Sequence, residues 1–487
     1  MTRAFDDDER LLGDLPTRSA TAAAGEIEDD DTMLVSGFGS VGNPKAVPEA
    51  LAASDRDLAL TVVSGGSTGD QIDTDMVEAD AIARRIPYQA RPEARRAVND
   101  RRIAFHDTHI SRLGDQAALG EFGNPDVAVV EAVAVGEDWL VPSTSIGHTP
   151  AYVDAADRLV VEVNRAQPTA LAALHDVYRP GLPPRGPIPL DGPGDRIGDS
   201  RIRFDPSKLV AVVETDDPDT PYSFRDPTDE DEAIAVNLVD FLTAELDRNP
   251  ALEEAIRLQF GVGSMGNALM GALESFDAGN RRLDYFGEVF QDGLLDLVRD
   301  GTFDAASATS LALSEDGQQQ LFDDIEGYTE RLVLRPADVS NRAELIDRFG
   351  VVGVNSALEV DIYGNANSTH VGGTRLINGL GGSGDFNRNG LLSITALPST
   401  AGRGDISRIV PMVPHVDHTE HDVSVIVTEH GVADLRGLSP VERAETVIDD
   451  CADPDFRPRL REYVDRAERQ RGHLPHDFDV AFDWFDE

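Results

Sequence analysis

The carboxylate of Glu288 is the first group in the sequence whose surroundings favour chemistry. It follows an apolar stretch and precedes a predicted helix over 294–299, which Asp292 or Gly293 is expected to cap. An acid between a strand and a helix lies at the edge of a sheet, where open α/β folds bind their ligands. Glutamate is usually exposed, so this stretch alone is also compatible with a solvated side chain.

Two glycine-rich runs share the pattern G-x-G-S-x-G-N, at residues 37–43 and 261–267, and each is expected to open a helix. The repeated pattern favours two related α/β halves. Such runs can also mark a dinucleotide site, which needs an acidic residue at the end of the following strand to hold a ribose. The predicted strand over 58–64 has no acid there, and the strand after the second run delivers Glu288 among apolar residues. A nicotinamide-dependent dehydrogenase is therefore disfavoured.

Three histidines recur at intervals of three, at His415, His418 and His421. They lie in a predicted loop between strands over 409–413 and 423–428. A zinc site needs a tight tetrahedral set of ligands, and these three could converge only on a strongly turned backbone. Histidines that make structural hydrogen bonds are the favoured interpretation, and no metal is expected.

A carboxylate near glycine loops suits acyl transfer. A carboxylate is a poor nucleophile towards amides, but a thioester is activated enough for it, and Glu is ionised at neutral pH without a partner base. Glycine loops allow backbone N–H groups to approach a tetrahedral intermediate and stabilise its oxyanion. The loops at 261–264 and 381–384 are the candidate donors.

Strands and helices alternate along most of the chain, which predicts an α/β fold with largely parallel sheets covered by helices. Besides the two strands beside the histidines, strands are predicted over 33–36, 58–64, 102–105, 127–135, 159–163, 209–214, 307–313, 331–334, 351–354 and 391–397, with helices over 76–85, 232–247 and 268–273. We predict a weakly ordered acidic leader at 1–32, an N-terminal domain at 33–225 and a C-terminal domain at 226–487 that carries Glu288.

Length and composition exclude several classes of protein. A chain of 487 residues is too long for one ordinary core. It has no apolar run near 18 residues and no signal-like start, so neither membrane spanning nor secretion is expected. The single cysteine, Cys451, rules out an internal disulfide and suits a reducing compartment, which favours the cytoplasm.

The charge balance is strongly acidic. Asp and Glu number 89 against 43 Lys and Arg, which gives a net charge of −46, and Lys45 and Lys208 are the only lysines. Acidic residues spread over the whole chain argue against a nucleic-acid partner. Their mutual repulsion is screened at high salt, so the composition indicates adaptation to a salt-rich cytosol.

From about Val35 to Ala467 the chain also resembles a known family. The motifs that carry the resemblance are GNPKAVP at 42–48, RRIPYQ at 84–89, EVN at 162–164, EVFQDG at 288–293, NSTH at 367–370, the glycine-rich stretch 378–388, and IVPMV at 409–413 with HVDHTEHDV at 415–423. Together they resemble the acetyl-CoA hydrolase/transferase family of class I coenzyme A transferases, and most closely its succinyl-CoA:acetate CoA-transferases.

This resemblance implies two related open α/β domains of the CoA-transferase type, with the active site between them. It also implies that Glu288 is the nucleophile, which attacks an acyl-CoA, becomes a glutamyl-CoA thioester and passes CoA to a second carboxylate. Acyl-CoA thioesters and small carboxylates are then substrates, with no permanently bound cofactor. A homodimer is expected. The histidine cluster is shared with the family and needs no metal there.

The resemblance also assigns roles to residues of the second half. Gly382 matches a loop that binds CoA and donates to the oxyanion, Glu429 matches an acid that supports the active-site network, and Asn378 matches a CoA contact. The loop matched to CoA binding and to the oxyanion in the second glycine run comprises Gly261, Val262, Gly263 and Ser264. Relatives usually carry a CoA-binding Lys near 401–404, where this chain has Arg403, whose forked guanidinium is not equivalent to a point charge.

Two activities remain open on these residues. Transfer of CoA to a carboxylate is favoured, and hydrolysis of the thioester by water is the alternative. They differ in how well water is excluded from the glutamyl-CoA. A binding module without catalysis is disfavoured because Glu288 is intact. The pairing of acetate with succinate rests on family analogy alone.

Overall fold

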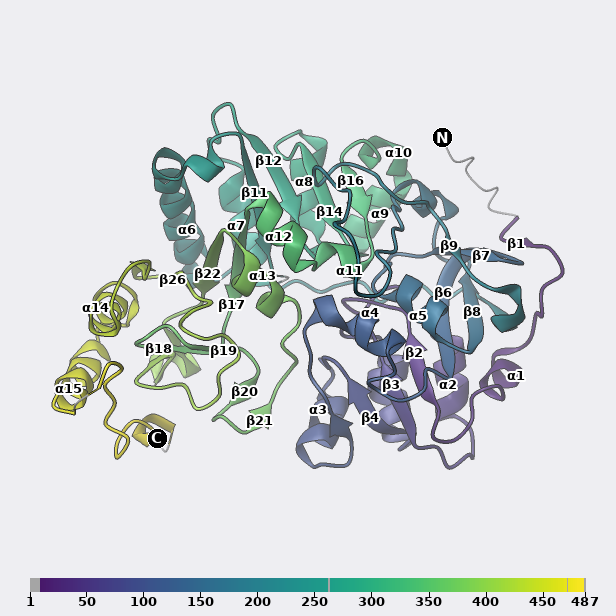
Figure 1. Ribbon diagram of the computed structural model, residues 1–487, viewed down its shortest axis with the longest axis horizontal. Coiled ribbons are helices and arrows are strands. Elements are labelled where there is room, and N and C mark those ends of the chain that lie inside the picture. Colours follow the sequence, from purple (N-terminus) through teal and green to yellow (C-terminus); the bar gives the residue numbers. More distant parts are fainter. Residues whose placement is uncertain (1–8, 262, 471, 486–487) are drawn as a thin grey trace. The chain divides into compact units, whose positions relative to one another are not determined.

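The computed structural model of the chain describes residues 9–261, 263–470 and 472–485 (Figure 1). The chain forms two compact units. The first unit comprises residues up to Ser223 together with Asp284–Leu345, and the second comprises Phe224–Leu283 together with residues from Ile346 onward. The chain therefore leaves the first unit close to the predicted boundary at 225 but returns to it, so that Glu288 belongs to the first unit.

The first unit is built on a parallel sheet. Its strands, in spatial order, are β10 (Leu209–Thr215), β8 (Arg158–Asn164), β6 (Val127–Gly136), β2 (Thr32–Val35), β3 (Leu60–Val63), β4 (Ile82–Ile86) and β5 (Ala104–Phe105). Every residue of β6 is buried, as expected for a parallel strand covered on both faces. Helices of this unit include α2 (Ala46–Ala52), α3 (Pro92–Asn99), α4 (Ile110–Ala118) and α5 (Thr149–Ala155).

The returning segment adds further parallel strands to the first unit. The last three residues of β12 (Arg282–Phe286) pair with β14 (Ala305–Ala308), which pairs with β16 (Leu332–Leu334), and β13 (Val289–Phe290) pairs with β15 (Ser310–Leu311). Helices α8 (Asp292–Arg299), α9 (Glu315–Asp323), α10 (Ile325–Tyr328), α11 (Ala337–Ser340) and α12 (Ala343–Phe349) complete the segment and its C-terminal edge. The N-cap of α8 is Gln291, one residue before the predicted cap.

The second unit has its own parallel strands. In spatial order they are β11 (Ala255–Phe260), β17 (Val351–Ser356), β22 (Leu392–Ala396) and β26 (Val425–Thr428), with β27 (Gly431–Asp434) antiparallel at the edge. Helices of this unit include α6 (Asp229–Arg248), α7 (Ser264–Leu273), α13 (Ser383–Asn389), α14 (Pro440–Thr446) and α15 (Arg457–Ala467). The predicted strands over 351–354, 391–397 and 423–428 are confirmed within two residues at each end.

Residues 9–32 are an integral part of the first unit, so the expectation of a weakly ordered leader is wrong for them. Strand β1 (Leu11–Leu12) pairs with β6, and helix α1 (Ala20–Ala24) packs on α2. Ala23 and Ile27 are fully buried in the core. The acidic composition of this segment therefore concealed a few apolar residues whose burial stabilises it on the first unit.

The helix predicted over 76–85 is also wrong. The helical segment there includes the π-helical turn η1 (Gln71–Met76) and ends at residue 78, and residues 82–86 form β4. Two adjacent arginines in β4 obscured the strand in the sequence. One of them, Arg85, is buried because its Nε donates to Oδ1 of Asp73 at 2.7 Å, which neutralises its charge inside the unit.

The two glycine-rich runs have different conformations despite their shared pattern. In the first, Gly37, Gly39, Ser40 and Gly42 have positive φ angles and form a turn, and α2 begins only at Ala46. In the second, α7 begins at Ser264, directly after Gly263 at φ 138°. The sequence predicted that this helix is capped by Asn43 with Pro44 in its first turn, and the helix begins two residues after Pro44.

Among the described residues, no helix is both long enough and apolar enough to cross a membrane.

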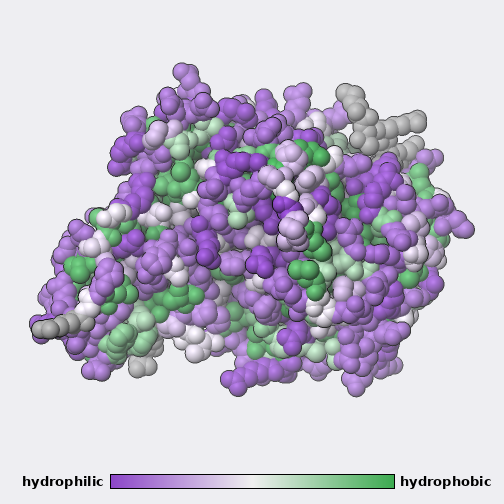
Figure 2. Space-filling model, viewed as in Figure 1, coloured by the Kyte–Doolittle hydropathy of each residue, from purple (hydrophilic) through white to green (hydrophobic). Residues whose placement is uncertain are grey.

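Hydrophilic residues cover most of the face seen in Figure 2. With a net charge of −46, many carboxylates on neighbouring elements must repel one another. The Debye length falls from about 10 Å at 0.1 M salt to about 3 Å at 1 M.

We expect the thermal midpoint and the activity to rise steeply between roughly 0.1 and 2 M KCl, a range over which screening changes several-fold. Differential scanning calorimetry in a KCl series measures the midpoint. A parallel series in sucrose is the control, since sucrose favours compact states without screening charge. A midpoint that is flat in KCl would contradict the halophilic interpretation.

Candidate active site

The backbone around Glu288 is fixed by hydrogen bonds between the ends of neighbouring strands. Strand β12 ends at Phe286, and the Gly287 N–H donates to the carbonyl of Ser307 at 3.0 Å. The carbonyl of Glu288 accepts from the N–H groups of Thr309 and Ser310 at 2.8 and 3.1 Å. These bonds hold Glu288 between β12 and β13, at the carboxyl edge of parallel strands, where the sequence placed it.

The side chain of Glu288 is oriented by an amide. Nδ2 of Asn341 donates to Oε1 of Glu288 at 2.7 Å. Asn341 is fully buried at the C-terminal end of α11, whereas Glu288 is half-buried. A rigid, buried donor thus holds one carboxylate oxygen, and a hydrogen bond to the charged form stabilises it.

Two tyrosines, the buried Tyr285 and the half-buried Tyr88, lie close enough to Glu288 to be affected by its charge. Burial raises the pKa of Tyr88 to about 12, and the nearby Tyr222 and Glu288 add to the effect. Burial, together with Glu288, also raises the pKa of Tyr285. Both phenols therefore stay protonated and uncharged at neutral pH. Tyr88 has a φ of 51°, an uncommon conformation for a bulky residue.

The first glycine turn, residues 37–42, packs against the strand that follows Glu288. A Cβ placed on Gly39 would lie 3.6 Å from Cγ2 of Val289 and 3.5 Å from Oγ of Ser310. Phe38 packs with Val289, and the hydroxyl of Tyr222 donates to the carbonyl of Gly39 at 2.6 Å. Sequence reasoning assigned the oxyanion donors to other loops and missed this turn. The pattern that this turn shares with the second glycine run could have marked it as a further candidate loop near Glu288.

The second glycine run lines a pocket of the second unit. The residues that line the pocket are Phe260, Gly261, Met265, Gly266, Leu269, Val354, Asn355, Ser356 and Ala396. These residues come from the carboxyl ends of β11, β17 and β22 and from the first turns of α7. The loop predicted to bind CoA therefore borders a cavity at the ligand-binding edge of a parallel sheet.

Several predicted CoA-binding residues lie near this edge. Gly382 is buried and precedes α13, which packs on β17 and β22. Oδ1 of Asn378 is buried without a hydrogen-bond partner among the described residues. The hydroxyl of Ser264 accepts from Nη2 of Arg225 at 2.7 Å. Val262 lies outside the described residues.

The remaining two predicted residues differ in their surroundings. Glu429 directly follows β26, and its Oε2 accepts from the N–H of Ser399 at 2.8 Å while Oε1 accepts from the Ser399 hydroxyl at 2.5 Å. Arg403 is exposed, with φ 67°, between β23 (Thr400–Ala401) and β24 (Ile406–Ser407). Glu429 is thus held in place, whereas Arg403 extends from a hairpin.

The three histidines have separate partners. Nε2 of His418 lies 3.2 Å from the hydroxyl of Ser383, and Nε2 of His415 lies 3.1 Å from Oδ1 of Asp417. His421 is exposed. Within the described part of the chain, no group of three or more His, Cys, Asp or Glu side chains is placed to hold a metal ion. The preference for hydrogen-bonding histidines agrees with these contacts.

Comparison with known proteins identifies the family. Models of the N-terminal and C-terminal domains of acetyl-CoA hydrolases/transferases match residues 16–214 and 317–464. The succinyl-CoA:acetate CoA-transferase of Clostridium kluyveri is 42% identical over 473 residues, which cover 96% of this chain and 88% of that relative. The chain belongs to the acetyl-CoA hydrolase/transferase family. It is therefore an enzyme, and the family resemblance inferred from the motifs is confirmed.

Relatives of similar identity carry different names within this family. The acetyl-CoA hydrolase of Candida glabrata is 40% identical over 471 residues, covering 92% of this chain and 89% of the relative. The solved structure of RipA from Yersinia pestis matches 93% of this chain and 97% of its own at a TM-score of 0.70, with 24% identity. The structural match confirms the predicted α/β fold class. It does not decide between transferase and hydrolase.

The contact between Asn341 and Glu288 yields a test with two variants. In Asn341→Ala the carboxylate loses an orienting donor, and we expect kcat for CoA transfer or acetyl-CoA hydrolysis to fall about tenfold. In Asn341→Asp a second carboxylate faces the first, and such a pair tends to share one proton, which raises one pKa strongly.

The acid limb of the pH–rate profile should therefore move upward by about one unit or more in Asn341→Asp, because the nucleophile must be ionised. Asn341→Ala is the matched control, since it removes the amide without adding charge. Steady-state rates between pH 5 and 9 measure both effects. Identical profiles for the two variants would show that residue 341 does not contact Glu288 in the working enzyme.

Proposed function

We propose that this enzyme transfers CoA between an acyl-CoA and a small carboxylate through a thioester on Glu288. The observation that carries the proposal is the position of Glu288. Its backbone carbonyl is tied to the N–H groups of Thr309 and Ser310, its Oε1 is held by Asn341, and it stands at the end of a parallel strand. A carboxylate held in this way meets the requirement for a nucleophile that needs no partner base.

The proposed reaction has four steps. The Glu288 carboxylate attacks the carbonyl carbon of the acyl-CoA, and the CoA thiolate leaves to give a mixed anhydride. The thiolate then attacks the glutamyl carbonyl, which releases the donor carboxylate and leaves a glutamyl-CoA thioester. An acceptor carboxylate attacks this thioester and expels the thiolate again. The thiolate finally attacks the acceptor's acyl carbon, which forms the new acyl-CoA and restores Glu288.

Three features of the first unit support this chemistry at Glu288. The phenols of Tyr88 and Tyr285 stay neutral, so they place no second negative charge near the carboxylate of Glu288. The glycine turn 37–42 leaves the approach to Val289 free of a bulky side chain at Gly39. The half-buried state of Glu288 keeps its carboxylate accessible to substrate.

The second unit supplies the proposed contacts to CoA. Gly261 borders the pocket at the end of β11, and Gly263 and Ser264 begin α7. The buried Oδ1 of the half-buried Asn378, which has no hydrogen-bond partner among the described residues, supports a polar contact to the ligand, because buried polar atoms are rarely left unpaired. On family resemblance we assign Val262 and Arg403 to CoA binding. On the same ground we assign Gly382 to oxyanion donation and Glu429 to support of the hydrogen-bond network of the active site.

Hydrolysis is the second candidate, because relatives named acetyl-CoA hydrolases are nearly as similar to this chain as the named transferases. Both activities use the same glutamyl-CoA and differ in whether water reaches it. The experiment that separates them follows acetyl-CoA formation from succinyl-CoA with and without acetate. Transfer predicts acetyl-CoA only when acetate is present, with little free CoA. Free CoA released at the same rate in both reactions would support hydrolysis.

The proposed nucleophile should form a covalent adduct. Incubation with acyl-CoA and no acceptor should add one CoA to the peptide that contains Glu288, because the thioester then has no carboxylate to consume it. Peptide mass spectrometry locates the adduct. The control is Glu288→Gln, which keeps the shape but removes the nucleophilic oxygen and should give no adduct. An adduct on any other residue would overturn the mechanism.

Gly382 should tolerate no bulk. Its φ of −86° is accessible to other residues, so Gly382→Val tests the space beside the amide rather than backbone strain. Loss of one oxyanion donor costs roughly 3–4 kcal/mol of barrier, and we expect turnover to fall about a hundredfold or more. Gly271→Val is the matched control, because Gly271 lies on α7 and a Cβ there meets nothing within 4 Å. Equal rates in the two variants would remove Gly382 from the site.

A further inference from the structure

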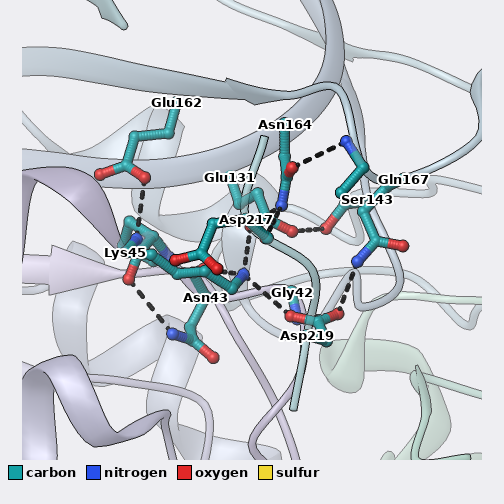
Figure 3. A network of polar contacts seen from close by, with 12 residues as sticks. Gly42, Asn43, Lys45, Glu131, Ser143, Glu162, Asn164, Gln167, Asp217 and Asp219 are labelled. Atoms are coloured by element: carbon teal, nitrogen blue, oxygen red, sulfur yellow. Dashed lines mark hydrogen bonds and ion pairs between the residues drawn. The ribbon is translucent and has the colours of Figure 1, made fainter. Parts of the chain in front are cut away.

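A buried cluster of charges lies in the first unit and takes no part in the proposed chemistry. Nζ of Lys45 donates to Oε2 of Glu131 at 2.6 Å, to Oδ1 of Asp219 at 2.9 Å and to the carbonyl of Asn43 at 3.1 Å (Figure 3). Lys45, Glu131 and Asp219 are 3%, 1% and 2% exposed. One ammonium thus faces two carboxylates, and all three of its protons are used.

The cluster joins two of the motifs that carry the family resemblance. The carboxylate of Glu162 accepts from the N–H groups of Lys45, Ala46 and Val47, and so caps the start of α2. Nδ2 of Asn164 donates to Oε2 of Glu131 at 2.9 Å. The motifs at 42–48 and 162–164 therefore meet at one buried site. Because this site is buried, we expect it to have a role other than contact with substrate.

One connection leads from the cluster to the glycine turn 37–42. The N–H of Gly42 donates to both carboxylate oxygens of Asp219 at 3.2 Å, as Figure 3 shows from close by. A Cβ at Gly42 would lie 2.7 Å from Cβ of Ser145, so the turn passes through a space that only glycine fits. The far end of the turn is Gly39, which packs against Val289 and Ser310. Asp219 thereby fixes the base of a turn whose tip lies beside Val289, the residue that follows Glu288.

A second connection runs through residues 143–147. The hydroxyl of Ser143 donates to Oε1 of Glu131 at 2.6 Å, and that of Thr144 donates to Oδ2 of Asp219. The carbonyl of Thr144 accepts from the N–H of Leu311 at 3.0 Å. The N–H groups of the next residues hold Thr309: Ile146 donates to its carbonyl at 2.9 Å and Gly147 to its hydroxyl at 3.0 Å.

This second connection ends on the backbone of the nucleophile, because the N–H groups of Thr309 and Ser310 donate to the carbonyl of Glu288. Two chains of contacts therefore lead from the cluster, one to Val289, which follows Glu288, and one to the amides that bind the Glu288 carbonyl. A displacement of about 1 Å at a reacting group can lower a rate about a hundredfold.

We propose that the Lys45–Glu131–Asp219 cluster is a positioning device, which holds the turn 37–42 and the segment 143–147 so that Glu288 is presented in one geometry. Asp219 is the principal positioning residue, because it alone bonds to Gly42, Lys45 and Thr144. All three charged residues are almost completely buried, so the proposal gives them no contact with substrate. The kinetic consequence rests on the proposed function of Glu288, whereas the structural coupling does not.

The test compares Asp219→Ala with Asp31→Ala. Asp31 is the matched control: it is 7% exposed in the same unit, and its Oδ2 accepts from the N–H of Glu28 and from Nη2 of Arg158, both at 2.7 Å. Amide hydrogen exchange is the first measurement. Asp219→Ala should speed exchange at Thr309 and Ser310 at least tenfold relative to wild type, and Asp31→Ala should leave it within about twofold.

Steady-state kinetics is the second measurement. In Asp219→Ala we expect kcat to fall about ten- to a hundredfold, while KM for the acyl-CoA stays within about twofold because the predicted CoA-binding loops belong to the second unit. Equal exchange at Thr309 and Ser310 in both variants, or wild-type kcat in Asp219→Ala, would overturn the proposal. If wild type forms no glutamyl-CoA, the proposed function fails, and the exchange measurement still decides the role of the cluster.

A milder variant keeps the test decisive if Asp219→Ala does not fold. Thr144→Val removes only the hydroxyl that donates to Asp219 and preserves the shape of a side chain that is 3% exposed. Exchange at residues 309–311 should rise several-fold and kcat should fall several-fold. Thr144→Val with wild-type exchange and wild-type kcat would overturn the proposal.

Discussion

The hydrogen bonds from the N–H groups of Thr309 and Ser310 to the carbonyl of Glu288 fix the point on which the candidate site depends. Glu288 lies in neither β12 nor β13, so no strand pairing holds its own backbone in place. A flexible glutamate between two short strands would sample many positions, and covalent chemistry tolerates few of them. The two amides restrict the backbone, and Asn341 restricts the carboxylate. The proposed nucleophile is thus held at its backbone and at its carboxylate.

The choice of lysine at position 45 follows from the geometry of its partners. The chain carries 43 basic residues and uses lysine only at Lys45 and Lys208. An ammonium presents three donors around one point, which matches one carbonyl and two carboxylates on different strands and loops. A planar guanidinium would need more room and a different arrangement of acceptors. Burial alone would lower the pKa of Lys45, but Glu131 and Asp219 outweigh it and raise that pKa, so the residue stays charged.

The sequence predicted those features that depend on local pattern. Strand β6 was predicted because a buried parallel strand is a continuous apolar run, and the position of Glu288 between a strand and a helix was predicted because both adjoin it in the sequence. Strand β4 was missed because the burial of Arg85 depends on its pairing with Asp73, which no local pattern reveals. Asn341 was missed for a similar reason, since 53 residues separate it from Glu288 and only tertiary packing brings α11 to the carboxylate. The shared glycine pattern gave the wrong start for the first helix. The same glycines form a turn in the first run and lead directly into a helix in the second.

Salt acts differently on the surface of this protein and on the cluster behind its nucleophile. Repulsion among exposed carboxylates extends about 10 Å at 0.1 M salt and only about 3 Å at 1 M. Lys45, Glu131 and Asp219 are almost completely buried, and buried pairs are screened far less than exposed ones. The proposed positioning contacts around Glu288 should therefore depend little on salt, whereas the acidic surface is predicted to depend on it. High salt would then reduce the repulsion of anionic substrates without loosening the proposed nucleophile. If the positioning charges lay on the surface, the ions predicted to stabilise this fold would weaken the proposed active site.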